Sequence, residues 1–144
     1  MLKKIIILLF IFIPIIIGCY NNENNAVSNK ITVYYLHPSK SCPTCKEVGA
    51  ITQKTIKKFF LSQLKNGQIV FSDINISKPE NDSIAAKFQC NWSGLYFLLN
   101  SNGNETTEDF TKTSFMYALN NPDTLEYLLK LKINEKIRAC LKFC

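Results

Sequence analysis

The sequence is poor in glycine, with five residues in a chain of 144. No glycine-rich turn follows a predicted strand, although such a turn brings the backbone close to the pyrophosphate of a nicotinamide or flavin dinucleotide. The cysteines are therefore the only redox-active groups that the sequence offers. We expect no cofactor other than a dithiol that cycles with its disulfide.

Histidine is scarcer still, since the chain contains one. A structural zinc site usually takes two pairs of closely spaced ligands. Cys42 and Cys45 form one such pair, and a second pair with the usual spacing is missing, so the sequence favours no metal site. The remaining candidate ligands are His37, Cys90, Cys140 and Cys144.

Blocks of like charge are also absent, although the chain carries a formal net charge of +6. The lysines are spread in the manner of a solvated helix face, as at Lys54, Lys57 and Lys58. No nucleic-acid-binding motif accompanies them. We therefore expect no nucleic-acid partner.

An apolar segment from Ile5 to Ile17 follows the basic start of the chain. It is shorter than the ~20 residues that a membrane-spanning helix requires, so it indicates a signal peptide. Ile16, Ile17 and Gly18 precede Cys19, and this run resembles the bacterial lipobox. The resemblance implies that Cys19 is lipidated and that the exported protein is anchored to a membrane, on the periplasmic side or at the cell surface. A cleaved signal peptide with a chance cysteine is the alternative.

The predicted organisation has three parts. Residues 1–18 form a lipoprotein signal peptide, and residues 19–30 form the lipid anchor and a polar, asparagine-rich linker. Residues 31–144 form one domain, with no internal repeat.

Strand-like and helix-like patterns alternate along this domain. β-Branched and aromatic residues predict strands at 31–36, 68–74, 95–99 and 105–110. Helical spacing of apolar residues predicts helices at 46–65, 80–88, 113–119 and 121–141. Ser77 and Glu80 have the spacing of a capping box before the second helix. This element order predicts an α/β, thioredoxin-like fold, a central mixed sheet of about four strands flanked by helices, with one short helix inserted before the last.

Cys42-Pro43-Thr44-Cys45 lies between the first predicted strand and the first predicted helix, the position of a thioredoxin-type redox site. Unpaired backbone N–H groups and the helix dipole stabilise a thiolate at a helix N-terminus. Cys42 is therefore the candidate nucleophile, and Cys45, one turn further on, is the candidate resolving thiol. The nearby His37, Lys40 and Lys46 would favour the thiolate further.

Two features of ordinary thioredoxins are missing. Position 36, six residues before Cys42, holds a leucine instead of a buried acid, with His37 beside it. The segment 91–94, before the third strand, lacks the proline that is cis in those proteins. These differences argue against general thioredoxin activity and for a specialised partner or substrate.

Several separated motifs resemble one family. Tyr35-Leu36-His37 precedes the Cys42–Cys45 motif, and the segment 73–81, Trp92-Ser93 and Asn121-Pro122 follow it. With the lipobox, they make the chain similar to the ArsF-type nitrophenyl compound nitroreductase subunit family of thioredoxin-like bacterial lipoproteins. The resemblance implies a dithiol subunit that works with a second small redox protein, or a membrane electron donor, on nitrated aromatic arsenicals. It also implies that Cys42 and Cys45 are the catalytic pair.

The same resemblance bears on the other cysteines, because trivalent arsenic favours three sulfur ligands. Cys90 is a candidate third thiol, since the loop 90–94 replaces the cis-proline loop beside the active site; a small buried residue is the alternative. Cys140 and Cys144 share one face of the last helix, either as core or fraying residues or as a disulfide or soft-metal pair. His37 is a candidate acid or base, and an ordinary loop histidine is the alternative. Trp92 is expected in the core, with stacking on an aryl substrate as the alternative.

Three functions remain open at this point. Thiol–disulfide exchange is the leading hypothesis. A binding or chaperone-like module with a static disulfide is the second. A thiol-based binder of soft metals or arsenite, without turnover, is the third.

Overall fold

The computed structural model describes residues 29–142. The predicted signal peptide, the lipidation site Cys19 and the tail residue Cys144 lie outside the described residues. Within the described range, no helix is both long and apolar enough to cross a membrane.

Within residues 29–142, four strands and five α-helices follow one another in the predicted order. The strands are β1 (Lys30–His37), β2 (Ile69–Asn75), β3 (Gly94–Ser101) and β4 (Asn104–Asp109). The helices are α1 (Pro43–Phe59), α2 (Leu61–Lys65), α3 (Asp82–Lys87), α4 (Thr111–Tyr117) and α5 (Pro122–Lys142), with a 3₁₀ turn, η3 (Pro79–Asn81), before α3.

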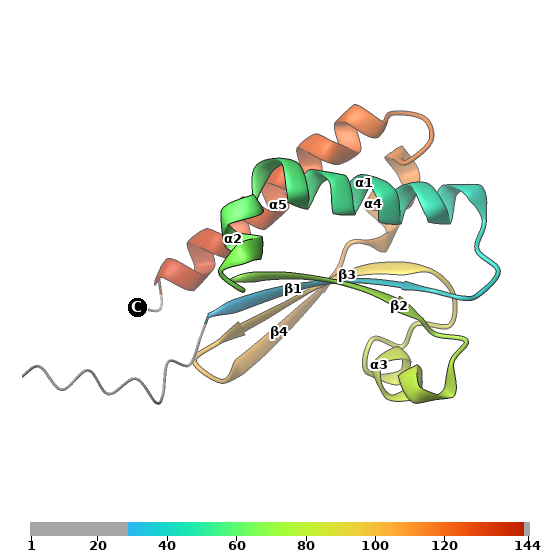
Figure 1. Ribbon diagram of the computed structural model, residues 1–144, viewed down its shortest axis with the longest axis horizontal. Helices are drawn as coiled ribbons and strands as arrows, with labels where there is room; N and C mark the ends of the chain where they lie inside the picture. The colour runs from blue at the N-terminus through green and yellow to red at the C-terminus, as the bar shows by residue number, and fades with distance from the viewer. Residues whose placement is uncertain (1–28, 143–144) are drawn as a thin grey trace, which may run out of the picture.

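The strands form one mixed sheet in the order β2-β1-β3-β4 (Figure 1). β1 pairs with β2 in parallel and with β3 in antiparallel fashion, and β4 continues the sheet antiparallel to β3. A helical crossover joins β1 to β2, as a parallel pair of strands requires. The α/β, thioredoxin-like fold is thereby confirmed.

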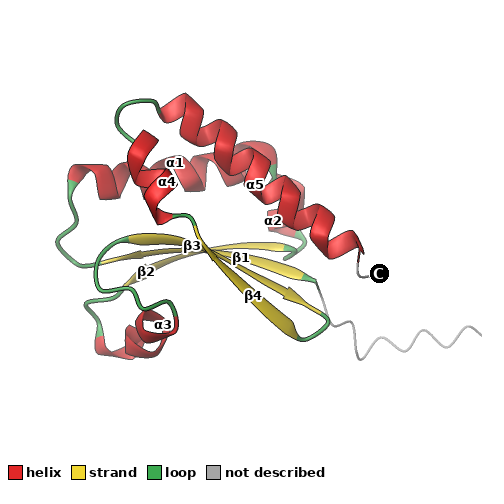
Figure 2. Ribbon diagram, turned by 180° about the vertical axis from the view of Figure 1, so that it is seen from behind, coloured by secondary structure: helices red, strands yellow, loops and turns green. Residues whose placement is uncertain are grey.

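Helices cover the two faces of the sheet unequally. α1 and α5 lie over one face, and the shorter α3 lies on the other (Figures 1 and 2). Successive residues of β1 pack on opposite faces of the sheet, because successive side chains of a strand point to opposite faces. Val33 and Tyr35 join the main core with α1 and α5, whereas Leu36 joins a smaller cluster against α3.

The turn between β3 and β4 has the geometry that its residues predict. Asn102 and Gly103 have φ angles of 51° and 83°, so both adopt the left-handed conformation of a tight hairpin turn. Ser101 pairs with Asn104 across the turn.

Two local predictions were wrong. The predicted helix 46–65 is divided at Phe60, whose φ of −132° ends α1 before α2 begins. The capping box is not formed, because the residue before the 3₁₀ turn is Lys78 and it has no side-chain capping bond. The Ser77 hydroxyl instead accepts a hydrogen bond from the Ser39 backbone N–H at 3.0 Å. It therefore ties the loop after β1 to the loop after β2.

Candidate redox site

Cys42 and Cys45 form a disulfide at the N-terminus of α1, with their Cα atoms 5.0 Å apart. Cys42 is the N-cap residue, and its sulfur accepts a hydrogen bond from the Cys45 backbone N–H at 3.1 Å. Pro43 occupies the first helical position, where its fixed φ favours the helix and its missing N–H costs no hydrogen bond. The sequence thus starts the helix at the disulfide.

The two sulfurs differ in their access to solvent. Cys42 is exposed, whereas Cys45 is 8% exposed. An external thiolate therefore has access to Cys42 and not to Cys45. This asymmetry, the fold and the position at a helix N-terminus are compatible with a redox module.

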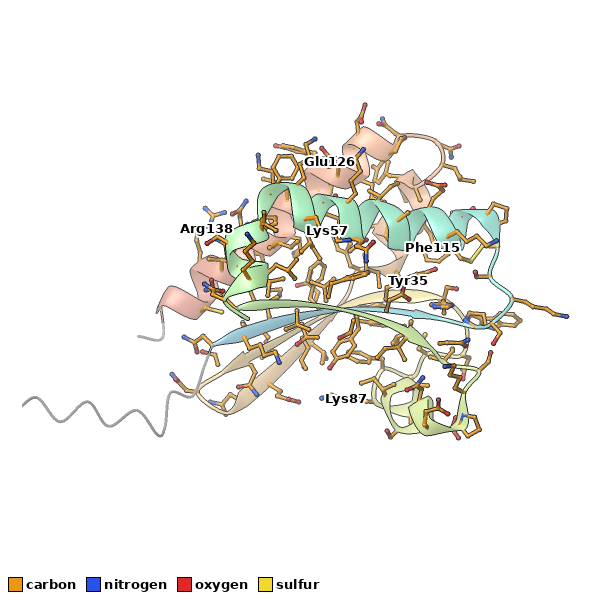
Figure 3. The ribbon with its side chains drawn as sticks, in the orientation of Figure 1. Tyr35, Lys57, Lys87, Phe115, Glu126 and Arg138 are labelled. Atoms are coloured by element: carbon orange, nitrogen blue, oxygen red, sulfur yellow. A yellow bond between two sulfur atoms is a disulfide. The ribbon has the colours of Figure 1, made fainter. Side chains whose placement is uncertain are left out.

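Tyr35 lies beneath this first turn, between the sheet and α1 (Figure 3). Its hydroxyl donates a hydrogen bond to the Cys45 carbonyl oxygen at 2.5 Å. Burial, chiefly, and the charge of Asp73 raise the pKa of Tyr35 to about 12, although the nearby Ser93 hydroxyl lowers it. Tyr35 therefore keeps its proton at neutral pH and remains a donor to the active-site turn.

The His37 imidazole and the Asp73 carboxylate lie within hydrogen-bonding distance beside Tyr35. The His37 Nε2 atom lies 3.0 Å from the Asp73 Oδ1 atom, and the His37 Nδ1 atom lies 2.9 Å from the Pro38 carbonyl oxygen. The rings of Tyr35 and His37 stack with their centroids 5.2 Å apart. His37 ends β1 and Asp73 lies on β2, so the parallel pairing of the two strands brings them together.

A groove of about 300 Å³ lies between α1 and the strands β1 and β2. This volume is at the lower end for small-molecule sites and is ample for water. The groove is lined by Tyr35, His37, Ser41, Lys46, Gly49, Ala50, Gln53, Phe71 and Asp73. Ser41 and Lys46 flank the two cysteines in the chain, which places the groove against the active-site turn.

The loop before β3 contributes Trp92 and Ser93. Trp92 is 78% exposed, so the expectation that it lies in the core was wrong. The Ser93 hydroxyl is buried and has no well-aligned hydrogen bond among the described residues, yet it is close enough to Tyr35 to lower the pKa of that residue. This loop therefore reaches the active-site turn through Tyr35, without a proline.

Cys90 is 7% exposed and packs with Leu36 and Tyr96 in the cluster against α3. Its thiol donates to the Trp92 carbonyl oxygen at 3.1 Å. Burial, chiefly, and the neighbouring Cys90 raise the pKa of Tyr96. Cys45 belongs to α1, which covers the opposite face of the sheet.

The remaining described cysteine, Cys140, is buried in the main core on α5. No group of three histidine, cysteine, aspartate or glutamate residues within 29–142 is arranged to hold a metal ion.

Sequence reasoning identified Cys42, Cys45 and His37, and it missed Tyr35, Gly49, Asp73 and Ser93 as parts of the same site. Asp73 was detectable in principle. It follows the apolar run Ile69–Phe71 near the carboxyl end of β2, and the carboxyl ends of parallel strands meet at one edge of the sheet. The contact of Tyr35 with α1 depends on how the helix packs, for which the sequence has no local signal.

Comparison with known proteins leaves the family open. No family model matches the chain, and no curated protein matches it. One solved structure, titled "Structure of a malarial protein", matches with 18% identity over 61% of this chain and 94% of that one. Its TM-score is 0.39. The fold and the site therefore define the class from this chain alone, a thioredoxin-like domain with a Cys-x-x-Cys disulfide.

Proposed function

We propose that the protein is a thiol–disulfide oxidoreductase whose working groups are Cys42 and Cys45. The observation that carries the proposal is the disulfide at the N-terminus of α1, with one exposed and one buried cysteine. A static disulfide would gain nothing from an exposed sulfur at a helix N-terminus, whereas a nucleophilic thiol is activated there.

The reaction cycle follows from the exposure of the two sulfurs. The Cys42 thiolate attacks a substrate disulfide and forms a mixed disulfide, releasing one substrate thiolate. Cys45 then attacks the Cys42 sulfur, the second substrate sulfur leaves, and the Cys42–Cys45 disulfide forms. Two electrons pass from the dithiol to the substrate, and an external thiol restores the dithiol.

The finer proposal is an exported, lipid-anchored protein that forms the dithiol subunit of a system acting on nitroaromatic arsenicals. It rests on the lipobox at Cys19 and on the family resemblance. Within it, the dithiol exchanges electrons with a second small redox protein or a membrane electron donor. A dithiol carries two electrons at a time, so the partner would complete the reduction of a nitro group.

The test is to reduce the folded protein with a mild dithiol and then alkylate it. A working pair opens and gains two alkyl groups while the circular dichroism of the fold is unchanged. Cys42→Ser abolishes redox cycling, and Cys45→Ser accumulates mixed disulfides. A disulfide that opens only after the protein unfolds contradicts the proposal and favours a binding module with a static disulfide.

The arsenical role is tested separately in a cell that carries the chain with its neighbouring genes. Loss of nitroaromatic arsenical resistance in the Cys42→Ser strain, but not in a strain with the parental chain, supports the finer proposal. Unchanged resistance contradicts it and leaves the thiol–disulfide activity as it is.

A further inference from the structure

Both ring nitrogens of His37 face hydrogen-bond acceptors. Nδ1 is 2.9 Å from the Pro38 carbonyl oxygen, and Nε2 is 3.0 Å from a carboxylate oxygen of Asp73. A carbonyl oxygen and an ionised carboxylate can only accept. Both hydrogen bonds are therefore made only when both nitrogens carry hydrogen, so the disulfide form is suited to an imidazolium at position 37.

The His37 ring lies one tyrosine ring away from the active-site turn. Tyr35 stacks on His37 with one face and donates through its hydroxyl to the Cys45 carbonyl oxygen. Both rings line the groove that also borders Ser41 and Lys46, so the groove extends from His37 to the residues on either side of the two cysteines. The His37 side chain is 24% exposed, so solvent reaches part of it.

The resolving cysteine needs such a neighbour. Cys45 is buried and must lose a proton before it can attack the Cys42 sulfur, because the thiolate is the nucleophile. Position 36 holds a leucine, which faces the α3 side of the sheet and cannot accept that proton. Imidazole, in contrast, exchanges a proton near neutral pH.

We propose that His37, positioned by Asp73, holds the proton that Cys45 loses when the disulfide forms and returns it when the disulfide opens. The inference rests on the proposed thiol–disulfide function and adds the proton acceptor of the resolving step. His37 is the acid and base of the relay, and Asp73 is a positioning residue that acts through it.

The step balances in both directions. When the disulfide forms, the Cys45 thiol gives its proton through water to neutral His37, its sulfur bonds to the Cys42 sulfur, and the substrate leaves as a thiolate with the electron pair. When an external thiolate attacks Cys42, the Cys42–Cys45 bond breaks. The Cys45 sulfur then takes the proton back from the imidazolium.

Three charged or titratable groups contact His37 or line the same groove. Asp73 approaches from β2, Lys46 lines the groove from α1, and Tyr35 stacks from β1. Asp73 carries a carboxylate and Lys46 an ammonium group. Tyr35 has its pKa raised to about 12, so it does not titrate in the pH range of the experiment.

The test is the rate at which dithiothreitol opens the disulfide of the folded protein, followed by alkylation at several pH values between about 5 and 8. The titration of the reductant is common to all variants, so the ratio of variant to parental rate reports the protein alone. We expect His37→Gln to slow opening on the order of tenfold at the acidic end, less than the 10²–10⁴ of a fully positioned acid because solvent also donates. The ratio should return towards one as the pH rises.

Two further variants separate a proton relay from a structural role. Asp73→Asn should slow opening at the acidic end by less than His37→Gln does, and this effect should fade as the pH rises. The substitution removes the carboxylate that positions the imidazole but keeps the imidazole itself. His37→Ala should be rescued by added imidazole, for which the groove has room. Glu80→Gln, an exposed acid outside the groove, is the matched control and should leave the profile unchanged.

The outcomes distinguish the relay from the function on which it rests. A disulfide that resists reduction in the folded parental protein defeats the proposed function itself. If the parental disulfide opens normally but the rate ratio for His37→Gln does not vary with pH, the relay is wrong and the proposed function stands. The same holds if added imidazole does not rescue His37→Ala. Asp73 is half-exposed, so its variant remains informative if the His37 variants are unfolded.

Discussion

Gly49 makes room for the ring of Tyr35. A Cβ atom at position 49 would lie 2.6 Å from the Tyr35 Cε1 atom and 2.8 Å from its Cδ1 atom, closer than packed side chains approach. Because position 49 of α1 has no side chain, the Tyr35 ring can pack directly against the helix below the active-site turn.

We expect Gly49→Ala to destabilise the protein by about 1–3 kcal/mol, the usual cost of overpacking. Alanine is the better helix former by about 1 kcal/mol, so a net loss must come from the collision with Tyr35. Urea denaturation of the disulfide form measures the change. In a Tyr35→Leu background the same substitution should cost much less, and an equal cost there would show that the ring is not the cause.

Tyr35 should make stability fall at alkaline pH. Its pKa is raised in the folded state from 10.0 to about 12, mainly by burial, so folding favours the protonated form. The contribution is complete below pH 10 and is lost as the pH rises towards 12. It amounts to roughly 2–3 kcal/mol, since the pKa rises by about two units and each unit corresponds to about 1.4 kcal/mol. Denaturation of the parental protein and Tyr35→Phe across this range should show a steeper fall for the parental protein. Parallel curves would contradict the assignment.

Glu108 should show the opposite pH dependence. Burial raises the pKa of this carboxyl, but hydrogen bonds and charge from Lys132 and Lys136 outweigh it and hold the pKa below its ordinary value of 4.5. The stabilisation is therefore present above that pH and disappears as the carboxyl is protonated at lower pH. Glu108→Gln should cost about 0.5–1 kcal/mol at pH 7 and nothing in strong acid, a small value because the side chain is about one-third exposed. Glu105→Gln, which breaks the single exposed pair with Lys87, should cost less.

Trp92 offers a test that needs no substrate. It is the only tryptophan of the chain, and it is 78% exposed on the loop before β3. Acrylamide should quench its fluorescence nearly as well as that of a free indole amide, and Trp92→Ala should change stability by less than about 0.5 kcal/mol. A protected, blue-shifted emission, or a loss of several kcal/mol, would mean that the indole is packed.

The order of elements was predictable because local patterns are strong on both sides of each boundary. Asn66-Gly67 ends the first helical region, and Asn102-Gly103 forms the hairpin turn, as their composition predicts. The break at Phe60 was not predictable, because phenylalanine carries no stop signal and the apolar stripe continues across it. The capping box at Ser77 was predicted wrongly, because the Ser77 hydroxyl can cap a helix or bond another loop. In the structure it accepts a hydrogen bond from Ser39, which is distant in the sequence.

The parts of the candidate site that are contiguous in the sequence were predictable. The contacts that arise from packing between distant segments were not. The Cys42–Cys45 motif is contiguous, so its place before a helix could be read directly. The contact of Asp73 with His37 needs the parallel register of β1 and β2, which α1 and α2 separate in the sequence. Trp92 was misplaced because an aromatic residue is usually buried, and a single loop residue gives no pattern that indicates its direction.

The central position of β1 also has a mechanical consequence. The strand that leads into the active-site turn begins at Lys30, where the chain enters the domain, and it is bonded along its length to β2 on one side and β3 on the other. A force applied through the N-terminus would act along the strand and would have to shear both ladders at once, instead of opening one ladder bond by bond. A load large enough to peel away an edge strand should therefore leave β1 and the redox site in place.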